Sequence, residues 1–169
     1  IKILDPQPHS LRVVGNLPYN ISTPVLFHLL KSHDLISDMT FMLQLEVVQR
    51  ITAKAGEKNY GRLGLMLQYH CEVEHLFNVP STAFTPAPKV GSAIVRLKPY
   101  KDKPLEANDP KILEMVIRTA FNQRRKTLKN SLKTLLRESR KPTAVDLSLR
   151  PETLSLKDYV EISNALTGD

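Results

Sequence analysis

The segment best suited to chemistry is the run Asn16-Leu17-Pro18-Tyr19, which directly follows a short apolar stretch. The Asn16 side-chain oxygen and the Leu17 carbonyl, which Pro18 holds outward, can both accept hydrogen bonds from one exocyclic NH2 group. The ring of Tyr19 can cover the face of the base that carries this group. The run therefore predicts a site for an adenine amine. Because Asn and Pro also favour turns, a plain turn after a strand is the alternative.

A second aromatic ring stands in the segment from Pro80 to Pro88, which three prolines stiffen. Holding Phe84 out on a rigid loop is unfavourable unless the ring is used. Tyr19 on one face and Phe84 on the other can clamp a base that has left its stack, with about 1 to 3 kcal/mol from each stacking contact. The alternative is that both rings are ordinary core aromatics.

The elements that must position these residues alternate between strands and helices. Residues 11–15 form an apolar, strand-like segment, and residues 23–31 form a helical pattern whose N-cap is Ser22 or Thr23. Residues 39–45 form a second strand, followed by a helix whose apolar face consists of Val47, Val48 and Ile51. This alternation is typical of a parallel α/β sheet, in which ligands bind at the carboxyl ends of strands. The Asn-Leu-Pro-Tyr run begins at such an end.

A composition change divides the chain. The remaining elements before it are a helix and two strands, at residues 63–71, 72–79 and 93–97. Residues 99–108 contain two prolines and several lysines and indicate a linker. The pattern afterwards is helical, beginning with Asp109-Pro110 as an N-cap and first-turn proline. We therefore predict an α/β domain at residues 1–105 and a small helical domain at residues 106–169.

Composition favours a globular cytoplasmic protein. The apolar content is 41%, and no run approaches the 18 or so apolar residues that a membrane-spanning helix needs. The N-terminus lacks the pattern of a signal peptide. The one cysteine, Cys71, has no partner for an internal disulfide. No Cys, His and carboxylate spacing indicates a metal site, so we expect none.

The positive charge is concentrated in one region. The net charge is +7, and residues 89–141 hold 15 of the 24 Lys and Arg but only 5 of the 17 Asp and Glu. Such a patch favours a polyanionic partner, because neutralising phosphates releases counterions. A second helix, expected at residues 127–137, carries part of it. The phosphate-contact candidates are Arg124, Arg125, Lys126, Lys129, Lys133, Arg137 and Arg140. A solvated helix face is the alternative.

Three stretches resemble the KsgA family of ribosomal-RNA adenine dimethyltransferases. The first, NLPYNIS at residues 16–22, is similar to motif IV of amino-methyltransferases that use S-adenosylmethionine. Residues 83–97 are similar to the family stretch F-x-P-x-P-K-V-x-S-A-V-V-R-L. Residues 120–132 match its F-x-x-R-R-K-T-L-x-N-S-L signature. The matches occur in the family's order over the whole chain, which makes the resemblance specific.

The resemblance implies the C-terminal part of a Rossmann-like, S-adenosylmethionine-dependent methyltransferase sheet, ending in an antiparallel strand and followed by a small all-α domain. It implies dimethylation of N6 of two adjacent adenosines in a 3′-terminal hairpin of small-subunit (16S) rRNA, with a role in ribosome biogenesis. Asn16, Leu17, Pro18 and Tyr19 would form the catalytic motif, and the family's motif VIII aromatic falls on Phe84. The expected partner is small-subunit rRNA within the pre-30S subunit. We expect a cytoplasmic monomer with no membrane attachment.

The implied chemistry explains why these residue types are needed. Adenine N6 is a poor nucleophile because its lone pair is delocalised into the ring. Acceptors at the Asn16 side chain and the Leu17 carbonyl would orient the amine, so that its lone pair points at the methyl group. No strong general base is required. Asn16 would also contact the cofactor.

The chain has no glycine-rich turn between a strand and a helix, and no acidic residue closes a strand before Asn16. In the family these features bind the cofactor and precede motif IV. We therefore expect a fragment that lacks most of the cofactor pocket, is inactive alone and acts as an RNA-binding module. For the parent protein, the alternatives are a methyltransferase of 23S rRNA that confers antibiotic resistance, and a non-catalytic RNA-binding or ribosome-assembly factor of the same fold.

Overall fold

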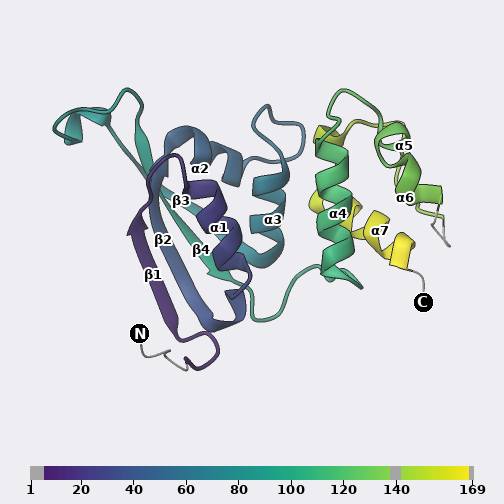
Figure 1. Cartoon of the computed structure of the whole chain (residues 1–169), viewed down its shortest axis with the longest axis horizontal. Coiled ribbons are helices and arrows are strands. Elements are labelled where there is room, and N and C mark those ends of the chain that lie inside the picture. The colour runs from purple at the N-terminus through teal and green to yellow at the C-terminus, as the bar shows by residue number, and fades with distance from the viewer. Residues whose placement is uncertain (1–5, 138–141, 168–169) are drawn as a thin grey trace. The chain divides into compact units, whose positions relative to one another are not determined.

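The computed structural model describes residues 6–137 and 142–167, which form two compact units (Figure 1). The first unit comprises Ile1–Thr52 and His70–Asp102, and the second comprises Ala53–Tyr69 and Lys103–Asp169. The segment Ala53–Tyr69 thus groups with the second unit, whereas the sequence alone placed it in the first domain. The functional division into a catalytic and an RNA-binding domain stays a prediction.

A mixed four-stranded sheet forms the centre of the first unit (Figure 1). Its strands are β1 (Leu11–Asn16), β2 (Ile36–Gln44), β3 (Cys71–Val79) and β4 (Ser92–Pro99), in the order β1-β2-β4-β3. β1 and β2 are parallel, and β4 is antiparallel to both of its neighbours. The predicted α/β fold with an antiparallel last strand is confirmed. β1 and β2 therefore end at the same edge of the sheet, which is the edge that holds Asn16.

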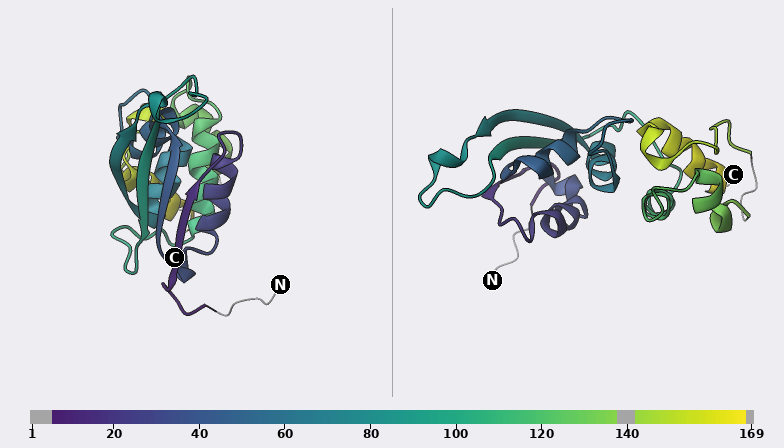
Figure 2. Two further views of the ribbon diagram at one scale, coloured as in Figure 1. Left: turned by 90° about the vertical axis from the view of Figure 1, so that its left-hand side faces the viewer. Right: turned by 90° about the horizontal axis from the view of Figure 1, so that it is seen from above.

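Alternation along the strands gives the sheet one buried face. In β2, Met39, Phe41 and Leu43 are buried, and the residues between them are partly exposed. Helices α1 (Ser22–Leu30) and α2 (Leu45–Thr52) lie on the same side of the sheet (Figures 1 and 2). α2 buries Val47, Val48 and Ile51, as the sequence predicted. The sheet and these helices form the core that holds the β1–α1 loop in place.

The start of α1 differs from the prediction. Ile21 occupies the N-cap position, and no side chain caps the helix. The prediction of Ser22 or Thr23 as N-cap is therefore wrong. The buried Ser22 hydroxyl instead donates to the Tyr19 carbonyl at 3.3 Å. This bond ties the first helical residue back to the loop, which a serine can do because its hydroxyl competes for nearby backbone groups.

The second unit is helical within the residues described. It contains α4 (Pro110–Phe121), α5 (Leu128–Ser131), α6 (Lys133–Arg137) and α7 (Leu156–Thr167), and also nearly all of α3 (Arg62–His70). Short 3-10 turns, His33–Leu35 and Ser81–Ala83 in the first unit and Pro151–Thr153 here, complete the elements. The Asp109 carboxylate accepts from the Lys111 backbone N–H at 2.8 Å. The predicted cap of α4 is therefore confirmed.

The helix predicted at residues 127–137 is interrupted. It divides into α5 and α6 at Leu132, whose φ of −97° and ψ of 7° are not helical. Leu128 and Leu132 are both fully buried. The prediction of one continuous helix is therefore wrong.

Three aromatic rings pack together in the core of the second unit. The Phe121 ring lies 6.1 Å from the Tyr60 ring and 6.0 Å from the Tyr159 ring, between centroids. Both phenols are buried and donate at 2.8 Å to backbone carbonyls, Tyr60 to Leu154 and Tyr159 to Pro151. Burial raises the pKa of both phenols well above the ordinary value of 10.0, with a smaller contribution from Asp158 for Tyr60 and from Tyr60 for Tyr159.

These raised pKa values predict that the second unit loses stability in alkali. Because the folded state holds the phenolic protons more tightly than the unfolded state, their contribution is complete below pH 10 or so. It falls as the pH rises further. Urea unfolding at pH about 8 and about 11 should show a lower free energy of unfolding at the higher pH. Tyr60→Phe should reduce this pH dependence, and an unchanged dependence in that variant would contradict the assignment.

Candidate functional site

A cavity of about 310 Å³ lies at the edge of the sheet where β1 and β2 end. All of the predicted catalytic residues line it: Asn16, Leu17, Pro18, Tyr19 and Phe84. Phe84 comes from the loop after β3, so folding brings it beside a loop more than sixty positions earlier. The structure therefore gathers the predicted residues in one place. Their catalytic roles stay predictions.

The loop after β1 is held by backbone hydrogen bonds. The Leu17 N–H donates to the Met42 carbonyl at 3.2 Å, which fastens the loop to the end of β2. The Ile21 N–H donates to the Pro18 carbonyl at 3.1 Å, which closes the turn. No described residue donates to the Asn16 side chain or to the Leu17 carbonyl. Both acceptors proposed from the sequence are thus available to a ligand.

The ring of Tyr19 is fixed by a contact that the sequence did not reveal. Its hydroxyl lies 3.2 Å from the hydroxyl of Ser92, the first residue of β4, and either oxygen can donate. Ser92 is 2% exposed, whereas Tyr19 is 41% exposed. A buried anchor thus holds an exposed ring at the cavity. The Tyr19 ring is already held in place before a base binds. Binding therefore costs little conformational entropy at this side chain.

We expect the Tyr19–Ser92 pair to act as a unit. Tyr19→Phe and Ser92→Ala each remove the hydrogen bond and leave the ring, so each should lower, about 2- to 10-fold, the rate of the methyl transfer that the sequence resemblance implies. The double variant should be no slower than either single variant, because both lose the same interaction. Single-turnover kinetics measure these rates. Losses that multiply in the double variant would show that the two hydroxyls act separately.

Sequence reasoning missed part of the cavity wall. Met42, Pro86, Pro88 and Ser92 also line it. Pro86 and Pro88 lie in the loop whose stiffness was predicted, and the family-like stretch at residues 83–97 contains Ser92. Met42 lies opposite Asn16 in the β1–β2 register. A cavity lined by aromatic, prolyl and thioether groups and by the acceptors at Asn16 and Leu17 fits a flat base with an exocyclic amine.

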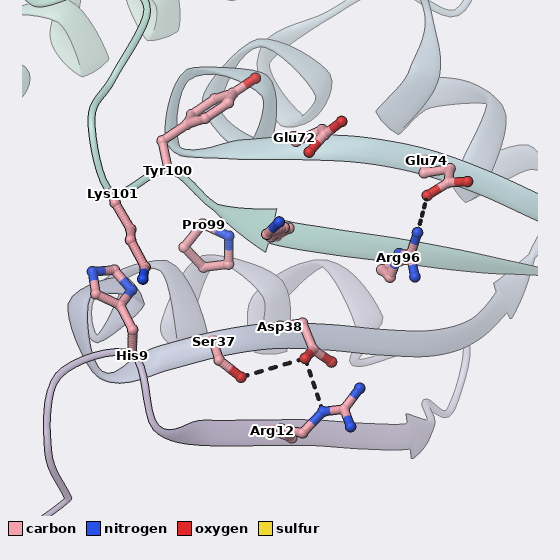
Figure 3. Close-up of a pocket in the computed structure, with 11 residues that line it drawn as sticks. His9, Arg12, Ser37, Asp38, Glu72, Glu74, Arg96, Pro99, Tyr100 and Lys101 are labelled. Atoms are coloured by element: carbon pink, nitrogen blue, oxygen red, sulfur yellow. Dashed lines mark hydrogen bonds and ion pairs between the residues drawn. The ribbon is translucent and has the colours of Figure 1, made fainter.

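A larger cavity, of about 710 Å³, lies at the opposite end of the same sheet (Figure 3). Arg12 pairs with Asp38 at 2.8 Å, and Arg96 pairs with Glu74 at 2.5 Å, both across neighbouring strands. Figure 3 shows Asp38 between Ser37 and Arg12. These carboxylates and cations largely satisfy one another, as cross-strand pairs do on a sheet face. Cavity size alone therefore does not identify the site.

The predicted phosphate contacts occupy exposed positions in the second unit. The exposed members are Arg124, Arg125, Lys126, Lys129, Lys133 and Arg137. Arg140 lies outside the described residues. The Arg124 guanidinium stands 5.8 Å from the centre of the Phe121 ring, so this arginine also contributes to packing. A role in RNA binding stays a prediction for the whole set.

Comparison with known proteins now adds to this geometry. The model of the family "Ribosomal RNA adenine dimethylase" matches residues 4–167, nearly the whole chain. The chain belongs to this family. Membership of the adenine dimethylase family confirms the resemblance that the Asn-Leu-Pro-Tyr, Phe84 and Arg-Arg-Lys stretches indicated.

The similar curated proteins are bacterial members of this adenine dimethylase family. The chain is 58% identical over 165 residues to ribosomal RNA small subunit methyltransferase A of Pseudomonas savastanoi pv. phaseolicola, covering 97% of the chain and 62% of that protein. It is 60% identical over 158 residues to the protein of the same name from Pseudomonas aeruginosa, covering 93% of the chain and 59% of that protein. The chain thus spans about 60% of the length of these curated relatives.

Solved structures agree with the family fold. A dimethyladenosine transferase from Plasmodium falciparum superimposes with a TM-score of 0.76 at 25% identity, covering 96% of the chain and 68% of that protein. The 23S rRNA methyltransferase ErmE superimposes with a TM-score of 0.65 at 21% identity, over 98% of the chain and 68% of that protein. The second likeness concerns the fold alone.

The described residues contain no group of three or more His, Cys, Asp and Glu residues placed to hold a metal ion. None of the described helices has the length and apolar character needed to cross a membrane.

Proposed function

We propose that the protein containing this chain transfers methyl groups from S-adenosylmethionine to N6 of two adjacent adenosines in a 3′-terminal hairpin of small-subunit (16S) rRNA. The observation that carries the proposal is the single cavity that joins Asn16, Leu17, Tyr19 and Phe84. Family membership and the names of relatives at 58–60% identity support the substrate. Such a modification would form part of ribosome biogenesis, with the pre-30S subunit as partner, in the cytoplasm.

Some of the cavity residues would bind the base, and others would orient its amine. Tyr19 and Phe84 line the cavity from different loops and would stack on a base taken out of its helix. The Asn16 side-chain oxygen and the Leu17 carbonyl would accept the two hydrogens of the N6 amine. Acceptors fixed on a short, hydrogen-bonded loop need little reorganisation. The amine would thereby be held with its lone pair directed at the methyl donor.

Asn16 is the residue of this chain that fits a contact with the cofactor. It is exposed at the carboxyl end of a parallel strand, where α/β sheets bind ligands, and no described residue donates to its side chain. S-adenosylmethionine supplies the electrophilic methyl group when bound. The proton lost by the amine leaves to solvent, since no described Asp, Glu or His lines the cavity.

Phe84→Ala tests the proposed function. In the protein that contains this chain, this variant should still bind the 16S hairpin, with an affinity reduced by no more than about 5- to 150-fold, because one stacking contact contributes about 1 to 3 kcal/mol. Its methyl-transfer rate should fall by at least 10-fold, since the base is no longer clamped. Phe84→Tyr keeps the ring and should retain most of the rate. Equal turnover of Phe84→Ala and wild type would remove Phe84 from the site.

The same assay distinguishes the neighbouring functions. A 23S rRNA fragment should be methylated far more slowly than the 16S hairpin, which primer extension on both RNAs measures. Preference for 23S rRNA would assign the protein to the large-subunit enzymes. Salt-sensitive binding of the 16S hairpin without methyl transfer by wild type would instead indicate a non-catalytic RNA-binding or assembly factor.

A further inference from the structure

A second cavity, of about 300 Å³, adjoins the base cavity. Its lining consists of Gln44, Leu45, Glu46, Gln49, Val90 and Gly91. The two cavities meet at the start of β4. Ser92, which lines the first cavity, pairs in register with Gln44, and the Leu45 N–H donates to the Gly91 carbonyl at 3.0 Å. Residues that are consecutive in the chain or paired across β2 and β4 therefore line both cavities.

The chemistry of the second cavity suits the edge of a base. Gln44 carries an amide, and an amide can pair with adenine through two hydrogen bonds, donating to N7 and accepting from the N6 amine. Among the described residues, no hydrogen bond engages the Gln44 side chain. Val90 is 45% exposed and supplies an apolar surface.

The side chains that line this second cavity favour a base over phosphate, the other group that RNA presents. Glu46 is exposed, although Arg50 pairs with it four residues along α2. A carboxylate repels phosphate but accepts hydrogen bonds from an exocyclic amine. No lysine or arginine among the described residues lines the cavity. The occupant that fits is therefore a base with an exocyclic amine rather than the backbone.

The spacing of the two cavities suits neighbouring nucleotides. Met42 lines the first cavity and Gln44 the second, and both lie on β2. Residues two apart on a strand are separated by about 6.8 Å and point to the same face. Stacked nucleotides of one strand rise by about 3.4 Å, so this separation suits neighbours that have come apart.

We propose that the second cavity receives the base adjacent to the target adenosine, and that Gln44 recognises its N6 amine edge. This inference rests on the proposed function. Where two adenosines are adjacent, one occupies the base cavity while the other occupies the second. A dimethylated N6 has no hydrogen to donate to Gln44 or Glu46, so the second cavity binds the unmodified neighbour better. The methylation state of one adenosine thereby affects reaction at the other.

The test combines a protein variant with a change in the RNA. Gln44→Ala is compared with wild type on the 16S hairpin and on two hairpins in which the base on either side of the target is purine, which is adenine without its amine. On the unmodified hairpin, Gln44→Ala should lower the second-order rate constant of methyl transfer about 10-fold, within a range of roughly 5 to 100. In wild type, one of the two purine substitutions should lower this rate constant by a similar factor. On that purine hairpin, Gln44→Ala should react no more slowly than wild type.

Controls separate recognition from folding. Gln44→Met, which keeps the length of the side chain but removes its amide, replaces Gln44→Ala if that variant fails to fold, and its rate should be equally insensitive to the neighbouring amine. Gln7→Ala, an exposed glutamine outside both cavities, should behave as wild type on every RNA. The inference would be overturned if the losses from Gln44→Ala and from the purine substitution multiplied. It would also be overturned if wild type methylated both purine hairpins as fast as the unmodified hairpin.

The outcomes also distinguish failure of this inference from failure of the proposed function. If the second cavity does not bind a base, wild type still methylates the hairpin, and its rate does not depend on the bases beside the target adenosine. If the proposed function is wrong, wild type does not methylate the hairpin at all. A hairpin with purine at the target position lacks the N6 nitrogen that receives the methyl group. This RNA serves as the inactive reference.

Discussion

Asn16→Ala should lower the rate of methyl transfer by about 10²- to 10³-fold, the loss typical of removing one preorganised group that stabilises a transition state. The side chain is exposed at the end of β1 and lines the base cavity beside the Leu17 carbonyl. With one acceptor left, the amine keeps a hydrogen bond but loses its fixed orientation. The loss should appear in kcat, with the KM for RNA nearly unchanged, because the RNA is held mainly by other contacts.

Asn20→Ala provides the matched control for this prediction. Asn20 is exposed in the same loop but does not line the cavity. The methyl-transfer rate of Asn20→Ala should therefore remain within a few-fold of wild type. Single-turnover methylation of the 16S hairpin and calorimetric titration with S-adenosylmethionine separate the two roles of Asn16. A variant that binds cofactor normally but fails in the methyl-transfer step supports amine orientation. Wild-type turnover in Asn16→Ala would exclude the asparagine from the site.

Replacing Arg125, Lys126 and Lys129 together by alanine should weaken binding of the 16S hairpin by about 10² to 10³ at roughly 0.1 M salt. All of these residues are exposed in the second unit. Each lost phosphate contact should also reduce the slope of log K against log salt by about 0.7 to 0.9, hence by roughly 2 to 3 in total. Arg124 is left in place because its guanidinium lies over the Phe121 ring. Titrations at several salt concentrations measure both quantities.

A variant with the same change in net charge tests whether position matters. Lys31, Lys54 and Lys58 are exposed and lie outside the predicted cluster. Their replacement by alanine removes as much positive charge, but should reduce the affinity and the salt slope much less. Equal losses in the two triple variants would mean that only the overall charge attracts RNA. The cluster would then be a solvated surface rather than an RNA contact.

The local chemistry of the site could be predicted from the sequence. The Asn16-Leu17-Pro18-Tyr19 run, with its acceptors and ring, is contiguous, so its character depends on residue types and turn preferences alone. The buried face of α2 followed from the spacing of its apolar residues. The cap of α4 followed from Asp109 and Pro110, which act within one helical turn. Interactions of this range are encoded by neighbours in the chain.

Only the tertiary structure decided which distant segments meet. The contact of Tyr19 with Ser92 spans 73 positions, and it depends on β4 pairing with β2 beside the end of β1. No local pattern predicts the partner of a buried serine hydroxyl. The interruption at Leu132 and the grouping of Ala53–Tyr69 with the helical unit were likewise set by packing. Burial of apolar surface is non-directional and acts between any segments that folding brings together, so it overrides weak local preferences. The sequence therefore determined which acceptors and which ring the loop at Asn16 carries, and the fold decided which residues complete its cavity.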